Sequence, residues 1–272
     1  MDVYIGFDSA WTDNLEAPGA ICSVGIENER PVWFHTPELM CFDQALTFFQ
    51  QVRSETGVTL IALDQPTVVP NSTGMRPVER VAASLIGWLG GGVQPSNRRR
   101  LGVFCDASPI WGFLSELKAE EQPEQARSAD RGLHLIEVFP TLALASLDDG
   151  FFGRRRAPKY NPIRGTFRSC DWKRVTNSAQ KQARQFGCEE LAEWHRAAEE
   201  IPQPRKSDQD KLDSALCVLT AMHWRLRPRE SSMILGDLSS GYMVLPASPQ
   251  VRDYLTCSAR KYSVAIDGKV PL

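Results

Sequence analysis

The stretch that decides the fold is "VYIGFDSAW" (residues 3–11). Large apolar side chains alternate with smaller or polar ones from position 3 to position 8, and this period of two predicts a β-strand. The strand is apolar enough to lie inside the protein, yet it ends on a carboxylate at Asp8. A lone aspartate after a strand is most often a turn former. The fold therefore depends on the next elements of the chain, and the function depends on whether other carboxylates meet Asp8.

The next elements of the chain predict a mixed α/β sheet. "GAICSVGI" (19–26) and "RPVWFH" (30–35) have the pattern of two strands separated by a short turn, which indicates an antiparallel meander. Residues 41–57 have apolar side chains at helical spacing and end at a glycine. "VTLIALDQP" (58–66) is a short apolar run typical of a central strand covered on both faces, and it reaches Asp64. The predicted order is β-β-β-α-β.

The rest of the chain contains further elements and one irregular region. We expect a helix over 77–89, a strand over 100–108, a helix over 109–123, a strand over 133–140, a helix over 177–200 broken at Gly187, a helix over 207–226 and a hairpin within 232–248. These elements favour a single domain over 1–272, with an exposed Arg/Pro-rich helical insertion at about 150–207 and a small C-terminal hairpin at about 231–246.

Composition excludes several classes of protein. With 42% hydrophobic and 24% charged residues, the chain is typical of a globular domain, and a net charge of −2 gives no global field for nucleic acid. The seven cysteines are scattered singly, which argues against a disulfide framework and a zinc cluster. The N-terminus lacks the pattern of a signal peptide, and no apolar run is long enough to span a membrane. A cytoplasmic location is therefore expected.

Five carboxylates occur where they could converge. Asp8 and Asp64 each follow a predicted strand, and Glu137 lies near the end of another, "LHLIEVFP". In mixed α/β sheets, ligands collect beyond the carboxyl ends of the central parallel strands. Asp210 and Asp213, in "DQDKLDSAL", are three residues apart and so lie on one face of a helix near its N-terminus. Taken singly, each of these residues is also explained as a turn former, a helix-start residue or a partner of an arginine.

Clustered carboxylates repel one another unless a cation lies among them. Hard divalent cations such as Mg²⁺ or Mn²⁺ prefer oxygen ligands. Two such ions can activate a water and stabilise the leaving oxygen of a phosphodiester. Convergence would therefore make a two-metal site, with Asp8 as a central ligand, able to hydrolyse phosphodiester bonds.

Four segments, "YIGFDSAW", "ALDQP", "IEVFP" and "DKLDSAL", resemble the motif series of the domain of unknown function 429 family. That family is predicted to be a ribonuclease-H-like nuclease, akin to the Holliday-junction resolvases. The resemblance implies a ribonuclease-H-like mixed sheet flanked by helices, with metal ligands Asp8, Asp64, Asp210 and Asp213. It makes Glu137 an added catalytic or orienting group. The chain departs from the resolvases at Asp64, where they carry a glutamate.

Basic residues supply candidate contacts to substrate phosphate. Arg76 and Arg80 lie in the segment that follows the Asp64 strand, and Lys159 lies in the basic run "GRRRAPK" (153–159). Solvated surface positions explain each of them equally well. Aromatic residues of the insertion, among them Tyr160, could stack on bases of a single strand.

Three functions stay open. The first is a Mg²⁺- or Mn²⁺-dependent nuclease acting on DNA or RNA. The second is a catalytically silent module that binds nucleic acid or protein. The third, an actin-like ATP-dependent phosphotransferase, is disfavoured because "GFDSAWTD" and "ALDQPTVV" lack Gly/Thr-rich phosphate loops. The sequence does not distinguish DNA from RNA or define the oligomeric state.

Overall fold

The computed structural model of the protein describes residues 1–271. The strands are β1 (Asp2–Asp8), β2 (Gly19–Glu27), β3 (Arg30–Met40), β4 (Val58–Leu63), β5 (Gly132–Glu137), β6 (Ser232–Asp237) and β7 (Gly241–Pro246). The α-helices are α1 (Phe42–Val52), α2 (Pro77–Trp88), α3 (Pro109–Leu117), α4 (Pro123–Ser128), α5 (Pro140–Leu147), α6 (Ser169–Gln185), α7 (Glu189–Glu199), α8 (Lys206–Leu226) and α9 (Pro249–Tyr262).

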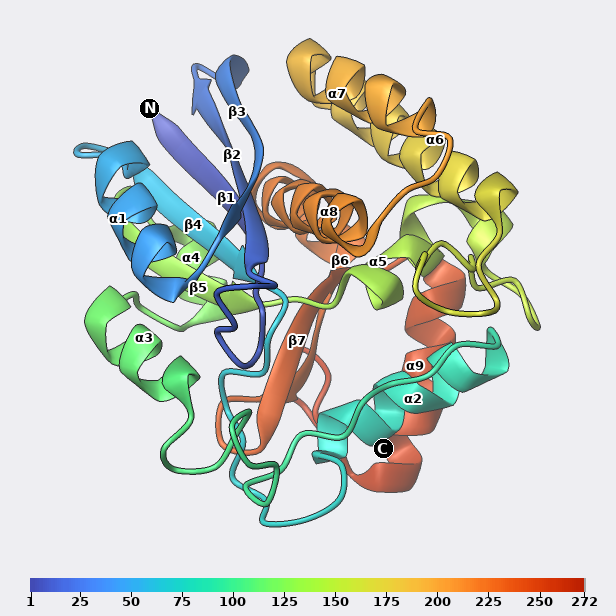
Figure 1. The fold of residues 1–272 in the computed structure, drawn as a ribbon. Coiled ribbons are helices and arrows are strands. Elements are labelled where there is room, and N and C mark those ends of the chain that lie inside the picture. The colour runs from blue at the N-terminus through green and yellow to red at the C-terminus, as the bar shows by residue number, and fades with distance from the viewer. Residues whose placement is uncertain (272) are drawn as a thin grey trace.

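A five-stranded mixed sheet forms the centre of the protein, with the strand order β3-β2-β1-β4-β5 (Figure 1). β1, β2 and β3 are joined as an antiparallel meander, while β4 lies parallel to β1 and β5 lies parallel to β4. The predicted β-β-β-α-β order and the mixed α/β class are confirmed. Because β1, β4 and β5 are parallel, their carboxyl ends meet at one edge of the sheet.

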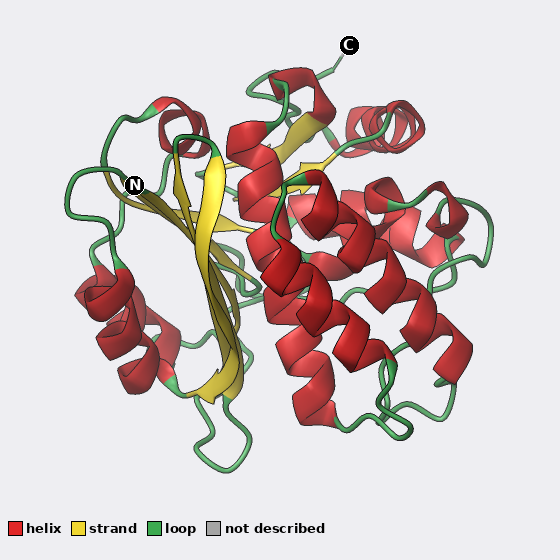
Figure 2. Cartoon of the chain, turned by 90° about the horizontal axis from the view of Figure 1, so that it is seen from above, coloured by secondary structure: helices red, strands yellow, loops and turns green. Residues whose placement is uncertain are grey.

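The alternation of side chains along β1 assigns its two faces to different helices. Val3, Ile5 and Phe7 pack with α1 and α3, whereas Tyr4 belongs to the core formed with α8, α6 and α7. Viewed from above, the sheet lies between a small group of helices on one face and a larger stack on the other (Figure 2). Both faces are therefore covered, as the continuous apolar run of β4 predicted.

A second core joins the C-terminal part of the chain to the sheet. β6 and β7 pair as an antiparallel hairpin, and apolar residues of α2, α5 and α9 pack against it. Val138, directly after β5, forms a parallel bridge with Val244 of β7. The hairpin is thereby placed beside the carboxyl end of β5.

The structure corrects the sequence-based prediction in several places. The strand expected over 100–108 is a series of turns, in which the amides of Val103, Phe104 and Cys105 all donate to the carbonyl of Arg100. The side chains of Val103 and Phe104 are buried in the core, although the loop that carries them does not pair with any strand. Their apolar character therefore reflects packing and not a strand. The helix expected over 109–123 ends at Leu117, followed by Lys118 in the left-handed conformation.

Other predicted boundaries differ more mildly. The break at Gly187 is confirmed and separates α6 from α7, but α6 already begins at Ser169. The sequence patterns do not predict the helices α4, α5 and α9. Each begins with a proline at the first helical position, a start signal that the sequence does contain.

Candidate active site

Two of the predicted carboxylates are neighbours at the edge where the parallel strands end. Phe7 of β1 pairs with Leu63 of β4, and the amide of Asp64 donates to the carbonyl of Phe7 at 2.9 Å. Asp8 follows Phe7 and Asp64 follows Leu63, so the two aspartates lie side by side at the ends of neighbouring strands. The ring of Phe7 contacts three phenylalanines of α1 and α3, which fixes the end of the strand that carries Asp8.

Helix α8 brings the third carboxylate to the same edge. An added Cβ at Gly6 would lie 2.0 Å from the carbonyl oxygen of Ser214 and 2.5 Å from the amide nitrogen of Val218. Only glycine therefore allows the backbone of α8 to lie directly on β1. This close approach sets Asp213, one residue before Ser214, near Asp8.

These carboxylates share one cavity of about 330 Å³. The acidic side chains that line it are Asp8, Asp64, Glu79, Glu137 and Asp213, and the basic ones are Arg76, Arg164 and Lys206. Asp210 lines an adjoining cavity of about 370 Å³ together with Asp8 and Lys206. Segments far apart in the sequence therefore bring all five predicted carboxylates to one region, with Asp210 at its outer side.

The electrostatics of the cavity are unfavourable for three negative charges. Burial and the charges of Asp64 and Asp213 raise the pKa of Asp8 well above its usual value. Burial and the charges of Asp213 and Glu137 do the same to the pKa of Asp64. Burial raises the pKa of Asp213 to about 6, although its hydrogen bonds and Lys206 oppose the shift. A cation placed among these groups would relieve the repulsion.

Lys206, at the first position of α8, supplies part of that positive charge. Its ammonium pairs with Asp210 one turn further along the helix and lies close enough to Asp8 and Asp213 to interact with both. Burial lowers the pKa of Lys206, but these carboxylates outweigh burial and raise it. Sequence reasoning missed Lys206; its spacing of four residues from Asp210 was the available signal.

Two hydrogen bonds hold the carboxylate of Asp213. The hydroxyl of Tyr160 donates to Oδ1 at 2.7 Å, and Nε2 of Gln209 donates to Oδ2 at 2.9 Å. Tyr160 is 4% exposed, so its ring is unavailable for stacking on bases, contrary to expectation. No motif in the sequence linked Tyr160 or Gln209 to Asp213.

Glu137 is held in a buried ionic network with Arg76. Both guanidinium NH₂ groups of Arg76 donate to the Glu137 carboxylate, at 2.9 and 2.6 Å, and its Nε donates to Glu79 at 2.9 Å. Arg76 is 0% exposed and Glu137 is 1% exposed. The amide of Thr67 also donates to Glu137. This network fixes the loop after β4 against β5 at the wall of the cavity.

The other predicted phosphate contacts lie elsewhere. Arg80 is exposed on α2 and does not line the cavity. The ammonium of Lys159 donates to the carbonyl of Gly90, in a separate pocket. Arg164, which sequence reasoning did not single out, is exposed and lines the carboxylate cavity.

The donor chemistry of the cavity fits a hard divalent cation. Asp8, Asp64 and Asp213 offer only carboxylate oxygens, the ligands that Mg²⁺ and Mn²⁺ prefer. As the side chains stand, no three Asp, Glu, His or Cys residues within 1–271 are grouped closely enough to hold an ion. An ion would therefore draw these carboxylates together, and the positive charge now among them is that of Lys206.

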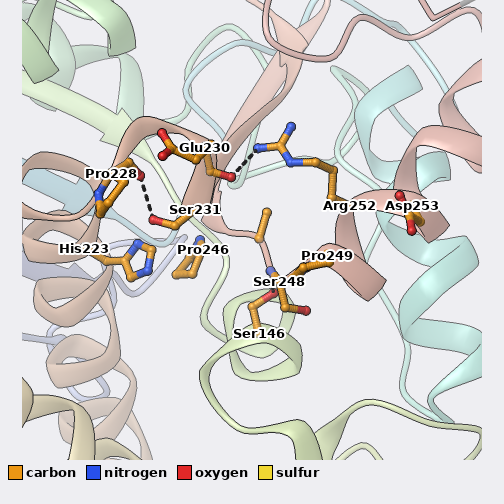
Figure 3. Close-up of a pocket in the computed structure, with 11 residues that line it drawn as sticks. Ser146, His223, Pro228, Glu230, Ser231, Pro246, Ser248, Pro249, Arg252 and Asp253 are labelled. Atoms are coloured by element: carbon orange, nitrogen blue, oxygen red, sulfur yellow. Dashed lines mark hydrogen bonds between the residues drawn. The ribbon is translucent and has the colours of Figure 1, made fainter.

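A larger cavity, of about 540 Å³, lies beside the hairpin (Figure 3). Two of its polar side chains already have partners: the Ser231 hydroxyl donates to the carbonyl of Pro228, and Arg252 donates to the carbonyl of Glu230 (Figure 3). Arg252 also pairs with Asp267, outside the lining of the cavity. Burial lowers the pKa of His223 there to about 4. Because no set of functional groups converges in it, the carboxylate cavity is the better candidate for the active site.

The fold and site define a mixed α/β protein with a carboxylate cavity at the carboxyl ends of its parallel strands. Residues 13–232 match the sequence model of a family described as "Protein of unknown function (DUF429)", and the chain belongs to that family. The match includes Asp64, Glu137, Asp210 and Asp213, whereas Asp8 precedes it. Neither a curated protein nor a solved structure matches the chain. None of the helices within residues 1–271 has the length and apolar character needed to cross a bilayer.

Proposed function

We propose that this protein is a metal-dependent nuclease with a ribonuclease-H-like fold, which hydrolyses phosphodiester bonds of nucleic acid. The observation that carries the proposal is the shared cavity of Asp8, Asp64 and Asp213, which come from the end of β1, the residue after β4, and α8. Carboxylates that are half-buried or buried and repel one another lower the stability of the folded protein, so stability does not explain why they lie together. Such an arrangement is typical of a functional site.

The fold supports the same proposal. The β-β-β-α-β start, the parallel placement of β1 and β4, and a late helix with two aspartates are what the family resemblance implied. In this proposal, Asp8, Asp64 and the two aspartates of α8 supply the carboxylates of that arrangement. A fold of this kind can host several functions, so the proposal depends on the site and not on the sheet.

The residues of the cavity have separate roles in this proposal. Asp8, Asp64 and Asp213 would hold one or two divalent cations, with Asp210 completing the set. When bound, Mg²⁺ or Mn²⁺ supplies the Lewis-acid chemistry that phosphodiester hydrolysis needs. Tyr160 and Gln209 orient the carboxylate of Asp213.

The basic groups and the network behind the cavity have supporting roles. Lys206 balances the charge of the carboxylates, and Arg164 at the rim would contact substrate phosphate. Arg76 and Glu137 keep the wall of the cavity in place through their buried ion pair.

A cleavage assay tests this proposal. Purified protein is incubated with labelled single-stranded, duplex and four-way-junction DNA and with RNA, in Mn²⁺, in Mg²⁺ and in EDTA. We expect cleavage of at least one substrate in Mn²⁺ or Mg²⁺ and none in EDTA. The variants Asp8→Asn and Asp213→Asn should lose cleavage, whereas Asp130→Asn, at an exposed position outside the cavity, should retain it. Binding of nucleic acid without any cleavage would favour the silent module instead.

A further inference from the structure

A separate, basic pocket of about 390 Å³ lies where the loop after α2 meets the segment before α6. Its basic side chains are Arg155, Arg156, Lys159, Arg168 and Arg174, and its one acidic side chain is Asp171. This excess of positive charge gives the pocket a positive potential that attracts anions. The carboxylate cavity does not include any of these residues.

The backbone of this pocket is well fixed. The amide of Arg155 donates to the carbonyl of Trp88 at 3.0 Å, and the amide of Ala157 donates to the carbonyl of Leu89 at 2.8 Å. Gly90 adopts a φ of 89°, and a Cβ there would lie 3.3 Å from the Cα of Arg155. The two segments therefore pack closely and hold the arginines at one place.

The single carboxylate in the pocket is already engaged. Asp171 accepts a hydrogen bond from the amide of Lys159 at 2.9 Å and another from Arg174 at 3.0 Å. Within residues 1–271, the guanidinium groups of Arg155, Arg156 and Arg168 make no ion pair or hydrogen bond. Arg168 also directly precedes the first residue of α6, where the helix dipole adds positive potential. Three guanidinium groups are thus free to bind an anion.

The basic pocket and the carboxylate cavity share the same two chain segments. Gly90 lines the pocket, while Gly92 and Gln94 of the same loop line the cavity. Likewise, the segment 155–168 contributes to both. Arg155, Arg156 and Arg168 line the pocket, whereas Arg164 and its neighbours line the cavity. A polyanion that leaves the cavity along these segments would reach the pocket next.

We propose that this basic pocket binds a backbone phosphate of the nucleic-acid substrate at a position away from the bond that is cleaved. The assignment rests on the proposed nuclease function for the identity of the substrate. Guanidinium groups suit this task because their paired N–H donors match phosphate oxygens. Free phosphate or a nucleotide offers the same chemistry, and the experiment separates these sources.

The test uses the full-length double variant Arg155→Gln/Arg168→Gln. Its matched control is Arg30→Gln/Arg131→Gln, which removes the same charge at exposed positions outside the pocket. All positions are exposed, so we expect both variants to keep the melting temperature of the wild type. Fluorescence anisotropy in EDTA measures the binding of labelled single-stranded DNA and RNA as a function of salt. Calorimetry measures the binding of inorganic phosphate and of a mononucleotide.

We expect the pocket variant to bind the oligonucleotide about tenfold more weakly than the control and the wild type. The slope of log K against log salt should fall by about 1.4, or about 0.7 for each lost single-strand contact. Equal affinities and slopes in the two variants would overturn the proposal. Tight binding of phosphate or mononucleotide, lost in the pocket variant while oligonucleotide binding is unchanged, would also overturn it.

The failure of this proposal can be told apart from the failure of the nuclease proposal. Binding is measured without metal, so it does not require the carboxylates to work. If Asp8→Asn loses cleavage while the pocket variant binds and cleaves normally, the basic pocket assignment is wrong and the nuclease stands. If wild-type protein binds through the pocket but cleaves nothing, the pocket stands and the nuclease proposal fails.

Discussion

Tyr160 and Asp213 are joined by a 2.7 Å hydrogen bond that connects the segment before α6 to helix α8. The phenol donates to a carboxylate whose pKa burial raises to about 6, so the bond favours the ionised form. The bond therefore holds the carboxylate in place and opposes the rise in the pKa of Asp213 that burial causes.

Tyr160→Phe removes this bond without changing the shape of the core. Because groups that orient ligands affect metal sites strongly, we expect Mn²⁺ affinity to fall by about 10- to 100-fold. The free energy of unfolding should fall by about 1.5–3 kcal/mol, since a buried hydrogen bond to a charged group is lost. Calorimetry and urea unfolding measure the two effects, and Tyr262→Phe at an exposed position is the control. Unchanged Mn²⁺ affinity would remove Tyr160 from the site.

Gly6→Ala tests the contact between β1 and α8. The added Cβ meets backbone atoms of α8 at 2.0 and 2.5 Å, so no side-chain rotation can relieve the clash. We expect a loss of about 1–3 kcal/mol or more in urea unfolding, together with weakened metal binding as Asp213 moves from Asp8. The control is Gly87→Ala, where an added Cβ meets nothing within 4 Å. That change should stabilise α2 by about 0.5–1 kcal/mol.

Arg76→Gln distinguishes a structural arginine from one that binds phosphate. The change leaves Glu137 buried and unpaired, so the free energy of unfolding should fall by about 3–5 kcal/mol. Arg80→Gln, at an exposed position on the same helix, should change it by less than about 0.5 kcal/mol. Chemical unfolding of both variants decides the matter. A stable Arg76→Gln protein with weakened nucleic-acid binding would restore the role that sequence reasoning gave to Arg76.

We expect His195 to make the folded protein sensitive to acid. It is 0% exposed, and within residues 1–271 neither ring nitrogen has a hydrogen-bond partner. Burial lowers its pKa to about 3, whereas an unfolded histidine titrates near about 6.5. Between these values the unfolded chain binds the extra proton. The free energy of unfolding therefore falls as the pH drops from about 6.5 toward 3.

The variant His195→Leu removes the titrating group, so the unfolded chain can no longer bind the extra proton. It also removes the buried imidazole ring that has no hydrogen-bond partner. Unfolding measured as a function of pH should show a shallower decline below about pH 6.5 than the wild type. At neutral pH the variant should be more stable by about 1–3 kcal/mol, because a buried polar group without a partner is lost. His35→Gln, at an exposed position, serves as the control. A parallel decline in both variants would show that His195 is not the source of the acid sensitivity.

The sheet and the convergence of the carboxylates could be predicted because they arise from local patterns. The alternation in residues 3–8 and the apolar run 58–63 identify two strands, and the aspartates that end them mark the shared edge. The spacing of Asp210 and Asp213 on one helix needed only the helical period. Each of these patterns spans only a few consecutive residues of the sequence, so it can be recognised without knowledge of the fold.

The remaining parts of the site depend on contacts between distant segments. The partnership of Tyr160 with Asp213 spans 53 residues, and that of Arg76 with Glu137 spans 61. Nothing in the sequence near Arg76 shows that its guanidinium turns inward to a carboxylate on β5. Val103 and Phe104 give residues 100–108 the look of a strand in the sequence, but these two side chains are apolar because they are buried from a loop, not because they belong to a sheet.

The most direct test of the carboxylate site is a Mn²⁺ titration by calorimetry on the wild type, Asp8→Asn and Asp130→Asn. We predict binding to the wild type and to Asp130→Asn, with binding lost in Asp8→Asn because one shared ligand has been removed. We also predict that Mn²⁺ raises the melting temperature of the wild type and Asp130→Asn alone. Equal binding by all three proteins, or no binding by the wild type, would contradict the claim that these carboxylates form a metal site.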